Sequence, residues 1–270
     1  MWKLELNKVF KNNNKLSLFG REMIALIVLS IFIASPALAF DFSGWDGLLK
    51  KNVEPKVISG VKLNAVNYKS IQKDPAYAKL IGDLKSYNLS GLKSKDEKLA
   101  FWINVYNIMA IKMVLDNYPV KSIKDAGSLF KSVWKKDVGV VAGKKQKLND
   151  IEHEILRKMG DPRIHVAIVC ASVSCPDLRA EAYTPAKLSD QLDDQLKLFL
   201  INQGKGLKVD SADNKLYLSS IFKWFEEDFE SEGGVVPFLS NYADSRYMTT
   251  LKSGKLKTKY LHYDWGLNEL

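Results

Sequence analysis

The sequence contains two cysteines and three histidines, and these few side chains carry most of its capacity for nucleophilic chemistry. Cys175 follows a run of small residues and directly precedes Pro176, which favours the first position of a helix. At such a helix cap, the positive end of the helix and the nearby Arg179 lower the pKa of a thiol. Cys175 is therefore a candidate nucleophile for a thiol-dependent acyl transferase or peptidase-like hydrolase.

The same cysteines support a second hypothesis. Exported proteins tend to pair their cysteines because their compartment is oxidising. Cys170 and Cys175 have four residues between them, and this short loop closes if their Cα atoms approach within about 6 Å. A structural disulfide, or two inert thiols, therefore competes with a catalytic thiol. The spacing matches neither a Cys-x-x-Cys redox motif nor a usual zinc-ligand pattern, so neither a metal nor another cofactor is expected.

A thiol nucleophile needs a base, and two of the histidines are candidates. His165 lies in an alternating run of β-branched residues that predicts a central strand, where a histidine is either a satisfied core residue or a base for Cys175. His153 lies in a predicted helix, and the competing interpretation is an exposed surface residue. Glu152, which precedes it, has the spacing of a capping box with Asn149 and so has a structural task available.

Two asparagines, Asn104 and Asn107, are three residues apart on a predicted helix and therefore share a face. This helix, predicted over residues 95–117, is apolar almost all round, which indicates burial on several sides. A buried amide without hydrogen bonds costs about 1–3 kcal/mol. The two amides are therefore predicted either to tie a neighbouring loop to the helix or to serve a catalytic site as orienting group or oxyanion donor.

An acid or a base could also come from the acidic run that follows Ile221–Phe225. The run continues an amphipathic helical pattern, so a solvated acidic face is the favoured interpretation and a catalytic carboxylate the alternative. Its members are Glu226, Glu227, Asp228 and Glu230.

The chain is basic, with 40 lysine and arginine residues against 31 aspartate and glutamate residues and a net charge of +9. If the protein is exported, its basic clusters favour an anionic envelope polymer or lipid head group as partner, and a solvated surface is the alternative. Nucleic acid is not expected because the clusters lack interleaved aromatic residues for base stacking. The clustered lysines are Lys131, Lys135, Lys136, Lys144, Lys145 and Lys147, followed by Lys252, Lys255, Lys257 and Lys259.

The first 39 residues are typical of a secretory signal peptide. A basic leader precedes the apolar run Ile24–Ile33, which is shorter than the roughly 18 residues needed to span a bilayer. Ala37-Leu38-Ala39 has the small-x-small pattern that signal peptidase requires, so cleavage is expected after Ala39. The mature protein is then periplasmic or secreted and has no transmembrane segment, and an uncleaved amphipathic anchor is the alternative.

The remaining chain, residues 40–270, contains no linker, repeat or low-complexity tract, so a single mature domain is expected. Within it, residues 40–93 are predicted to form a helical preface and residues 94–270 the core.

Periodicity predicts an α+β fold, in which many helices surround a small, mostly antiparallel sheet with β-hairpins. A doubly wound sheet is disfavoured because strands and helices do not alternate. Hairpins are predicted within 133–148 and 207–218, a strand over 164–169 and a last strand over 260–263. Helices are predicted near 42–52, 75–88, 95–117, 149–159, 186–202, 219–230 and 235–243.

Six motifs occur in order along the chain. They are AFWINVYN at 100–107, IEHEIL at 151–156, DPRIHVA at 161–167, SCPDLR at 174–179, SIFKWFEEDF at 220–229 and YDWGLN at 263–268. Together they resemble the domain of unknown function 547 family, over most of residues 60–270, and the chain is identified as an exported bacterial member. The resemblance implies no activity, and some plant relatives carry serine in place of Cys175. It does imply a shared site that includes Asn104, Asn107, Glu152, His153, His165, Ser174, Cys175 and Arg179.

Two functional hypotheses follow for an envelope protein with a pocket between the helix 95–117 and the loop after His165. The first is a thiol-dependent acyl transferase or peptidase-like hydrolase with Cys175 as nucleophile and His165 or His153 as base. The second is a non-catalytic module that binds anionic envelope components through its lysine-rich hairpin and contains a structural disulfide. Lys135, Lys136, Lys144 and Lys145 are the binding residues in that case.

Overall fold

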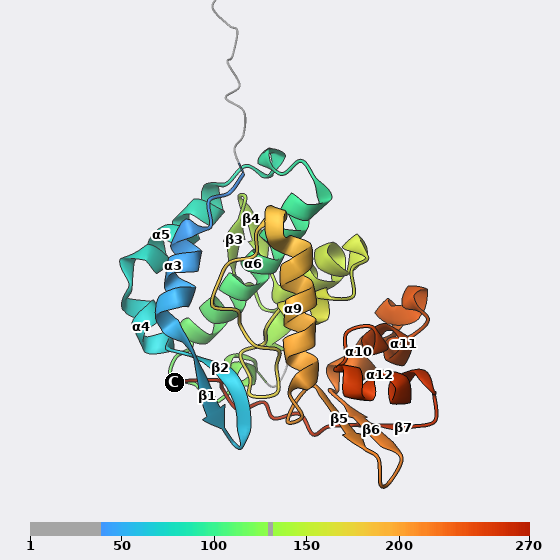
Figure 1. Ribbon diagram of the computed structural model, residues 1–270. Helices are drawn as coiled ribbons and strands as arrows, with labels where there is room; N and C mark the ends of the chain where they lie inside the picture. Colours follow the sequence, from blue (N-terminus) through green and yellow to red (C-terminus); the bar gives the residue numbers. More distant parts are fainter. Residues whose placement is uncertain (1–38, 129–131) are drawn as a thin grey trace, which may run out of the picture. The chain divides into compact units, whose positions relative to one another are not determined.

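The computed structural model describes residues 39–128 and 132–270 of the chain (Figure 1). The predicted signal peptide, apart from Ala39, and Lys131 therefore lie outside the described residues. The described residues belong to one compact unit that mixes many helices with three small sheets. The α+β, helix-rich fold predicted from periodicity is confirmed, although the single small sheet is replaced by three.

The central element is helix α6 (Lys95–Leu115), which begins at a capping box formed by Ser94 and Glu97. Of the helices in the described ranges, α6 is the one long and apolar enough to cross a bilayer, but 89% of its most apolar stretch is buried inside the protein. It contacts α4 (Tyr68–Lys73), α7 (Leu148–Asp150) and the helical turn η4 (Ile151–Leu156). The all-round apolar pattern of α6 thus reflects burial on several sides, as predicted.

The segment before α6 is not purely helical, so the predicted helical preface is wrong in part. Helix α3 (Ser43–Asn52) is followed by an antiparallel hairpin of β1 (Val53–Ile58) and β2 (Val61–Val66). Ser59 and Gly60 both have positive φ at the turn, a conformation typical of tight hairpins. The Ser-Gly pair was the sequence signal for this turn. The segment continues with α4, α5 (Pro75–Ser86) and the short turn η1 (Leu89–Gly91).

The predicted hairpin within 133–148 is confirmed as β3 (Gly139–Val141) and β4 (Lys144–Gln146). It lies after the short turns η2 (Ile123–Ala126) and η3 (Val133–Lys135). The predicted helix 149–159 is also present. It runs through α7, the π-helical turn η4 and the 3-10 turn η5 (Arg157–Met159).

The strand predicted over 164–169 is wrong, because residues 164–167 form the helical turn α8 (Ile164–Ala167). Asp161 starts this turn, since its carboxylate accepts the backbone N–H of Arg163 at 3.0 Å. Ile164 packs in one hydrophobic cluster and Val166 in the other, so α8 bridges the two parts of the core. His165, which lies between Ile164 and Val166 in the chain, is also buried.

The last part of the chain places short helices beside a three-stranded sheet. Its hairpin, β5 (Leu207–Asp210) with β6 (Lys215–Leu218), is confirmed with Leu207 opposite Leu218. The final strand, β7 (Lys257–Tyr260), lies three residues earlier than predicted and pairs in parallel with β6. The helices and turns are η6 (Pro185–Lys187), α9 (Leu188–Ile201), α10 (Ile221–Trp224), η7 (Glu226–Glu232), α11 (Val235–Ser240) and α12 (Ser245–Lys252).

Candidate functional site

The cysteines lie on a loop that leaves α8 and is held by α6. Asn107 fixes the start of the loop, because its amide donates to the carbonyl of Ala167 at 3.0 Å and accepts the N–H of Val169 at 2.9 Å. These two bonds satisfy the backbone groups of Ala167 and Val169 that a neighbouring strand would otherwise satisfy. Further on, the N–H of Val173 donates to the carbonyl of Gly266 at 2.9 Å, so the end of the chain lies alongside the loop.

Ser174 fastens the same two segments, since its hydroxyl accepts the N–H of Asp264 at 2.8 Å. The helix predicted to begin at Pro176 is absent, and the next helical turn is η6. Cys175 therefore lies on a loop and receives no helix dipole, which corrects the argument made for its activation from the sequence.

Both thiols are free and are not at disulfide distance, so the predicted Cys170–Cys175 disulfide is not formed in this structure. The backbone N–H of Cys170 donates to Sγ of Cys175 at 2.8 Å. The hydroxyls of Ser172 and Tyr263 each lie 3.2 Å from Sγ of Cys170. The two sulfur atoms thus occupy one small polar cluster within an apolar environment.

The two thiols have opposite pKa shifts. Burial alone raises the pKa of Cys170, but hydrogen bonds from Cys175, Ser172 and Tyr263 outweigh it and the pKa is lowered. Burial raises the pKa of Cys175 well above its usual value, and its role as donor to Cys170 adds to this rise. Cys170, which is half-buried, is therefore the thiol that more readily becomes a thiolate, and Cys175 is the donor that stabilises it.

Cys170 opens into a cavity of about 120 Å³. A wider groove of about 1330 Å³ lies between the β1–β2 hairpin and α9, but neither a cysteine nor a histidine lines it, so its size carries no chemical argument. The smaller cavity combines titratable groups with aromatic walls. It is lined by Tyr106, Trp134, Glu152, His165, Ile168, Val169, Cys170, Cys175, Ile221, Trp224, Phe225, Tyr263 and Trp265.

His165 reaches this cavity with one ring nitrogen engaged and the other unpaired. Its Nε2 lies 2.7 Å from Oδ2 of Asp228, which holds the proton on Nε2. Its Nδ1 is buried and has no hydrogen-bond partner among the residues that the structure describes. Burial lowers the pKa of His165, although the negative charge of Asp228 opposes this, so the ring is neutral at pH 7. A neutral imidazole with an unpaired Nδ1 can accept a proton there.

Asp228 is fixed by a second partner, Arg157 of η5, whose Nε donates to Oδ2 at 2.7 Å and whose Nη2 lies 2.6 Å from Oδ1. Burial raises the pKa of Asp228, but the bonds from His165 and Arg157 dominate and hold it well below its usual value. Phe225 stacks on the His165 ring with centroids 4.1 Å apart. The imidazole is therefore held in orientation by an ion pair and by a ring contact.

The acidic run after Phe225 has two environments. The favoured interpretation, a solvated acidic face, is wrong for Asp228, whose side chain points to His165, and fits Glu226, which is exposed. Glu227 is 68% exposed but also pairs with Arg157. The helix predicted over 219–230 divides after Trp224 into α10 and η7, and Asp228 lies on η7.

Glu152 lies inside the protein and does not form the predicted capping box. Its Oε2 accepts the hydroxyl of Tyr106 from α6 at 3.1 Å. Burial raises the pKa of Glu152 to about 7, although the Tyr106 bond and the charge of Arg157 oppose the rise. Near neutral pH, Glu152 can therefore take up or release a proton beside the cysteines.

His153 is half-buried rather than exposed, and its Nδ1 lies 2.8 Å from Nη1 of Arg157. It does not line the cavity. Asn104 is also remote from the thiol cluster in its contacts, because its amide exchanges two hydrogen bonds with the backbone of Tyr183, at 2.8 and 3.0 Å. Asn104 and Asn107 thus both tie loops to α6, which is the structural role predicted for them.

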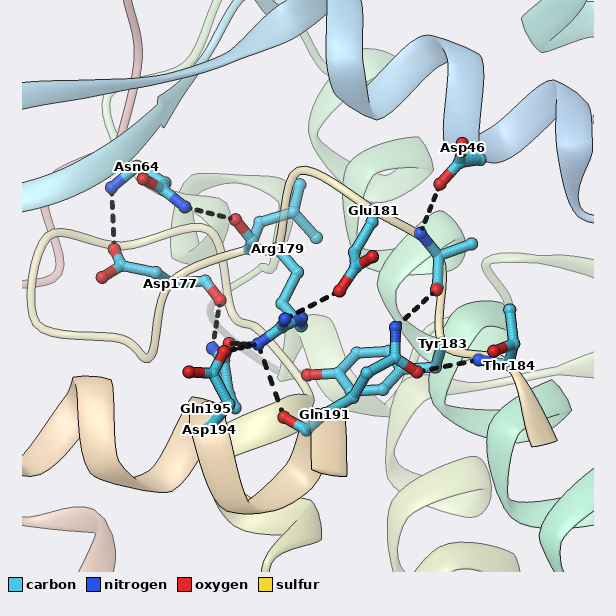
Figure 2. A network of polar contacts seen from close by, with 12 residues as sticks. Asp46, Asn64, Asp177, Arg179, Glu181, Tyr183, Thr184, Gln191, Asp194 and Gln195 are labelled. Atoms are coloured by element: carbon cyan, nitrogen blue, oxygen red, sulfur yellow. Dashed lines mark hydrogen bonds and ion pairs between the residues drawn. The ribbon is translucent and has the colours of Figure 1, made fainter. Parts of the chain in front are cut away.

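The loop after Cys175 is held by a polar network (Figure 2). Arg179 donates to Glu181 and to Asp194 of α9, each at 2.7 Å, so its charge is compensated there. Gln195 of α9 donates to the carbonyl of Asp177 at 2.6 Å. Arg179 therefore supports the loop and is not among the groups that act on either thiol.

The lysines of the proposed binding hairpin do not line the cavity. Lys135, Lys144 and Lys145 are exposed, and Lys145 lies 3.7 Å from Asp137. Lys136 is half-buried and donates to the carbonyl of Ala126 at 2.5 Å. No group of three or more metal-binding side chains occurs within residues 39–128 and 132–270.

Residues 89–200 match the family described as "Protein of unknown function, DUF547". This span contains α6, both cysteines and His165, in the order that the resemblance predicted. Residues 89–200 belong to the DUF547 family. No curated protein and no solved structure matches it.

The DUF547 span supplies only part of the site. Asp228, Trp224 and Tyr263 come from beyond residue 200, on η7, α10 and the final segment. Sequence reasoning missed Tyr106 and Tyr263 and considered Cys170 only as a disulfide partner or an inert thiol. Tyr106 lies within the 100–107 motif, while Asp228 and Tyr263 lie in the last two motifs, so motif membership was the available signal for all three.

Proposed function

We propose that this protein is a cysteine-dependent acyl hydrolase or acyl transferase in which Cys170, rather than Cys175, is the nucleophile. The observation that carries the proposal is the state of His165. Its Nε2 is held by Asp228, its Nδ1 is buried and without a partner among the described residues, and His165 lines the cavity that Cys170 also lines. A thiol, an imidazole base and a carboxylate that orients the base are the groups that thiol-dependent acyl transfer requires.

The proposed reaction has two steps. Cys170 Sγ attacks the carbonyl carbon of the acyl donor, and Nδ1 of His165 takes the thiol proton. The carbon–sulfur bond forms, the bond to the leaving group breaks, and His165 returns the proton to that group. Water or a second acceptor then attacks the thioester and gives its proton to His165. The carbon–sulfur bond breaks, Cys170 leaves as the thiolate, and His165 returns the proton to it.

Three neighbouring groups support this assignment. The hydroxyls of Tyr263 and Ser172, each 3.2 Å from Sγ, stabilise the thiolate and can donate to the developing oxyanion. Glu152 lines the same cavity and is the second candidate for proton transfer. Asp228 does not face the thiol in this proposal and acts as a positioning residue for His165.

The experiment is to trap the acyl-enzyme. The protein is mixed with p-nitrophenyl butyrate and quenched in acid, and peptide mass spectrometry locates the butyryl group. We expect it on Cys170, together with a burst of nitrophenol. Cys175→Ser should keep the burst, whereas Cys170→Ser and His165→Gln should lose it while their circular dichroism stays unchanged. A burst that survives Cys170→Ser but not Cys175→Ser would restore Cys175 as the nucleophile, and a burst that survives both would reject thiol catalysis.

We also propose, from the predicted leader, that the protein acts in the periplasm or outside the cell. A binding role of the lysine hairpin toward anionic envelope components stays a separate proposal, supported by the exposure of Lys135, Lys144 and Lys145. Intact mass of the protein recovered from the periplasm tests export, since a chain that starts at Phe40 is expected. Salt-sensitive pelleting with anionic vesicles, lost in Lys144→Gln/Lys145→Gln, tests the hairpin.

A further inference from the structure

We infer that the cavity beside Cys170 selects a short, uncharged, apolar acyl group with about four to six carbons. This inference rests on the proposed acyl-transfer function and names its substrate class. It comes from three features of the cavity, namely its volume, the chemistry of its walls and the exposed aromatic surface at its edge.

The volume limits the length of the acyl group. The cavity measures about 120 Å³. An apolar cavity of about 150 Å³ in another protein holds one benzene molecule, so this one accommodates at most about five non-hydrogen atoms beyond the carbonyl group. Ile168 and Ile221 are both buried residues of the wall, and they restrict the space available to a longer chain.

The walls favour an uncharged group. Within residues 39–128 and 132–270, neither lysine nor arginine lines the cavity, so a substrate carboxylate finds no counter-ion among these side chains and faces Glu152 instead. Two of the polar wall residues, Glu152 and Tyr106, are hydrogen-bonded to each other. A cationic group would need Glu152 ionised, and burial opposes that form. Burial of methylene groups is therefore the main attraction that these walls offer.

The remainder of the substrate has an aromatic surface to lie on. Trp224 is 47% exposed and lies nearly parallel to Trp265, with ring centroids 5.8 Å apart and planes at 16°. Tyr263 packs against both rings, at 4.8 and 4.6 Å, and its hydroxyl reaches Cys170. Because Trp224 is exposed and also lines the cavity, its ring is suited to contact the apolar part of a leaving group.

The first test is a homologous series of p-nitrophenyl esters, from acetyl to decanoyl, on the whole protein. We expect kcat/KM to rise by about fourfold per methylene up to butyryl or hexanoyl. It should then fall at least tenfold by decanoyl, because the longer chain does not fit.

An ester with a terminal ammonium or carboxylate group on a six-carbon chain should be at least about 100-fold slower than hexanoyl. The p-nitrophenyl ester of N-acetyl-leucine is measured beside the hexanoyl ester. This pair compares a peptide acyl group with a fatty acyl group of the same apolar chemistry.

Ile221→Ala enlarges the cavity and should move the chain-length optimum to octanoyl or longer. Ile111→Ala is the control: it removes the same atoms from a buried site outside the cavity and should leave the optimum unchanged. Should Ile221→Ala fail to fold, binding is measured in Cys170→Ala by tryptophan fluorescence. Hexanamide should then bind at least tenfold more tightly than decanamide or 6-aminohexanamide. Cys170-dependent turnover without a length optimum, or with a preference for charged chains, overturns this inference alone. Turnover that survives Cys170→Ser overturns the proposed function instead.

Discussion

Nε2 of His165 lies 2.7 Å from Oδ2 of Asp228, although 63 residues separate them in the chain. The contact joins the helical turn α8 to η7 and fixes the imidazole so that the buried Nδ1 is the nitrogen without a partner. It also places an ionised carboxylate against a neutral ring, the arrangement that stabilises an imidazolium when the ring accepts a proton.

Asp228→Asn should leave the fold intact but reduce kcat/KM by roughly 10²–10⁴-fold, because the ring loses its oriented tautomer. Asp228 raises the pKa of His165, so its loss should also move the acidic limb of the pH–rate profile to lower pH. Glu227→Gln is the matched control, since Glu227 pairs with Arg157 but is 68% exposed. An unchanged profile in Asp228→Asn would remove Asp228 from the mechanism.

Cys175→Ala should raise the pKa of Cys170, because it removes a hydrogen-bond donor to the thiolate. The variant has a single cysteine, so its iodoacetamide rate reports on Cys170 alone. At pH 7 we expect this rate to be about tenfold lower than in Cys175→Ser, which keeps a donor at this position. Equal titration midpoints for the alanine and serine variants would show that Cys175 does not act on Cys170.

Glu152→Gln should change how stability depends on pH. The folded pKa of about 7 lies above the reference value of 4.5, so the folded state binds more protons between these values and wild-type stability falls as pH rises through them. Compared with Glu152→Gln, the wild-type protein should lose about 2–3 kcal/mol of unfolding free energy between pH 5 and pH 8. Tyr106, Arg157 and Asp228 face this carboxyl group and remain in both proteins.

Urea unfolding at each pH measures the difference. Glu154→Gln, on the exposed side of the same turn, is the control and should show the wild-type dependence. Parallel curves for the wild-type protein and Glu152→Gln would contradict the raised pKa.

Asn107→Ala and Asn104→Ala should both destabilise the fold by about 3 kcal/mol, since each leaves buried backbone groups without partners. Only Asn107 holds the segment that leads into Cys170. We therefore expect Asn107→Ala to slow iodoacetamide labelling of Cys170 under native conditions, and Asn104→Ala to leave it unchanged. Equal labelling rates in the two variants would mean that the Asn107 bonds do not position the thiol.

Much of the fold was predictable from local patterns. The capping box at Ser94 and Glu97 and the apolar run that follows predict α6, and alternation around turn residues predicts the β3–β4 and β5–β6 hairpins. These elements are determined by periodicity and by turn chemistry within a few residues. The β1–β2 hairpin had similar signals around Ser59 and Gly60, and reading that segment as helical overlooked them.

The wrong prediction of a strand around His165 has a different cause. Its β-branched run favours a strand, but no strand in the described part of the chain pairs with it. Asn107 supplies the backbone hydrogen bonds on either side of Ile168 instead. Asp161 and Pro162 start a helical turn that local propensity alone does not reveal. Tertiary contacts thus override a strand propensity worth only about 1 kcal/mol.

The sequence by itself determined the helix-rich α+β class, the family and the small set of residues able to do chemistry. Only the tertiary structure decided which of them act together. It brings Asp228 to His165 and Tyr263 to Cys170, and it makes Cys170 rather than Cys175 the more acidic thiol. The reason is that pKa and hydrogen bonding depend on burial and on neighbours within a few ångströms, and here those neighbours come from segments up to 93 residues away.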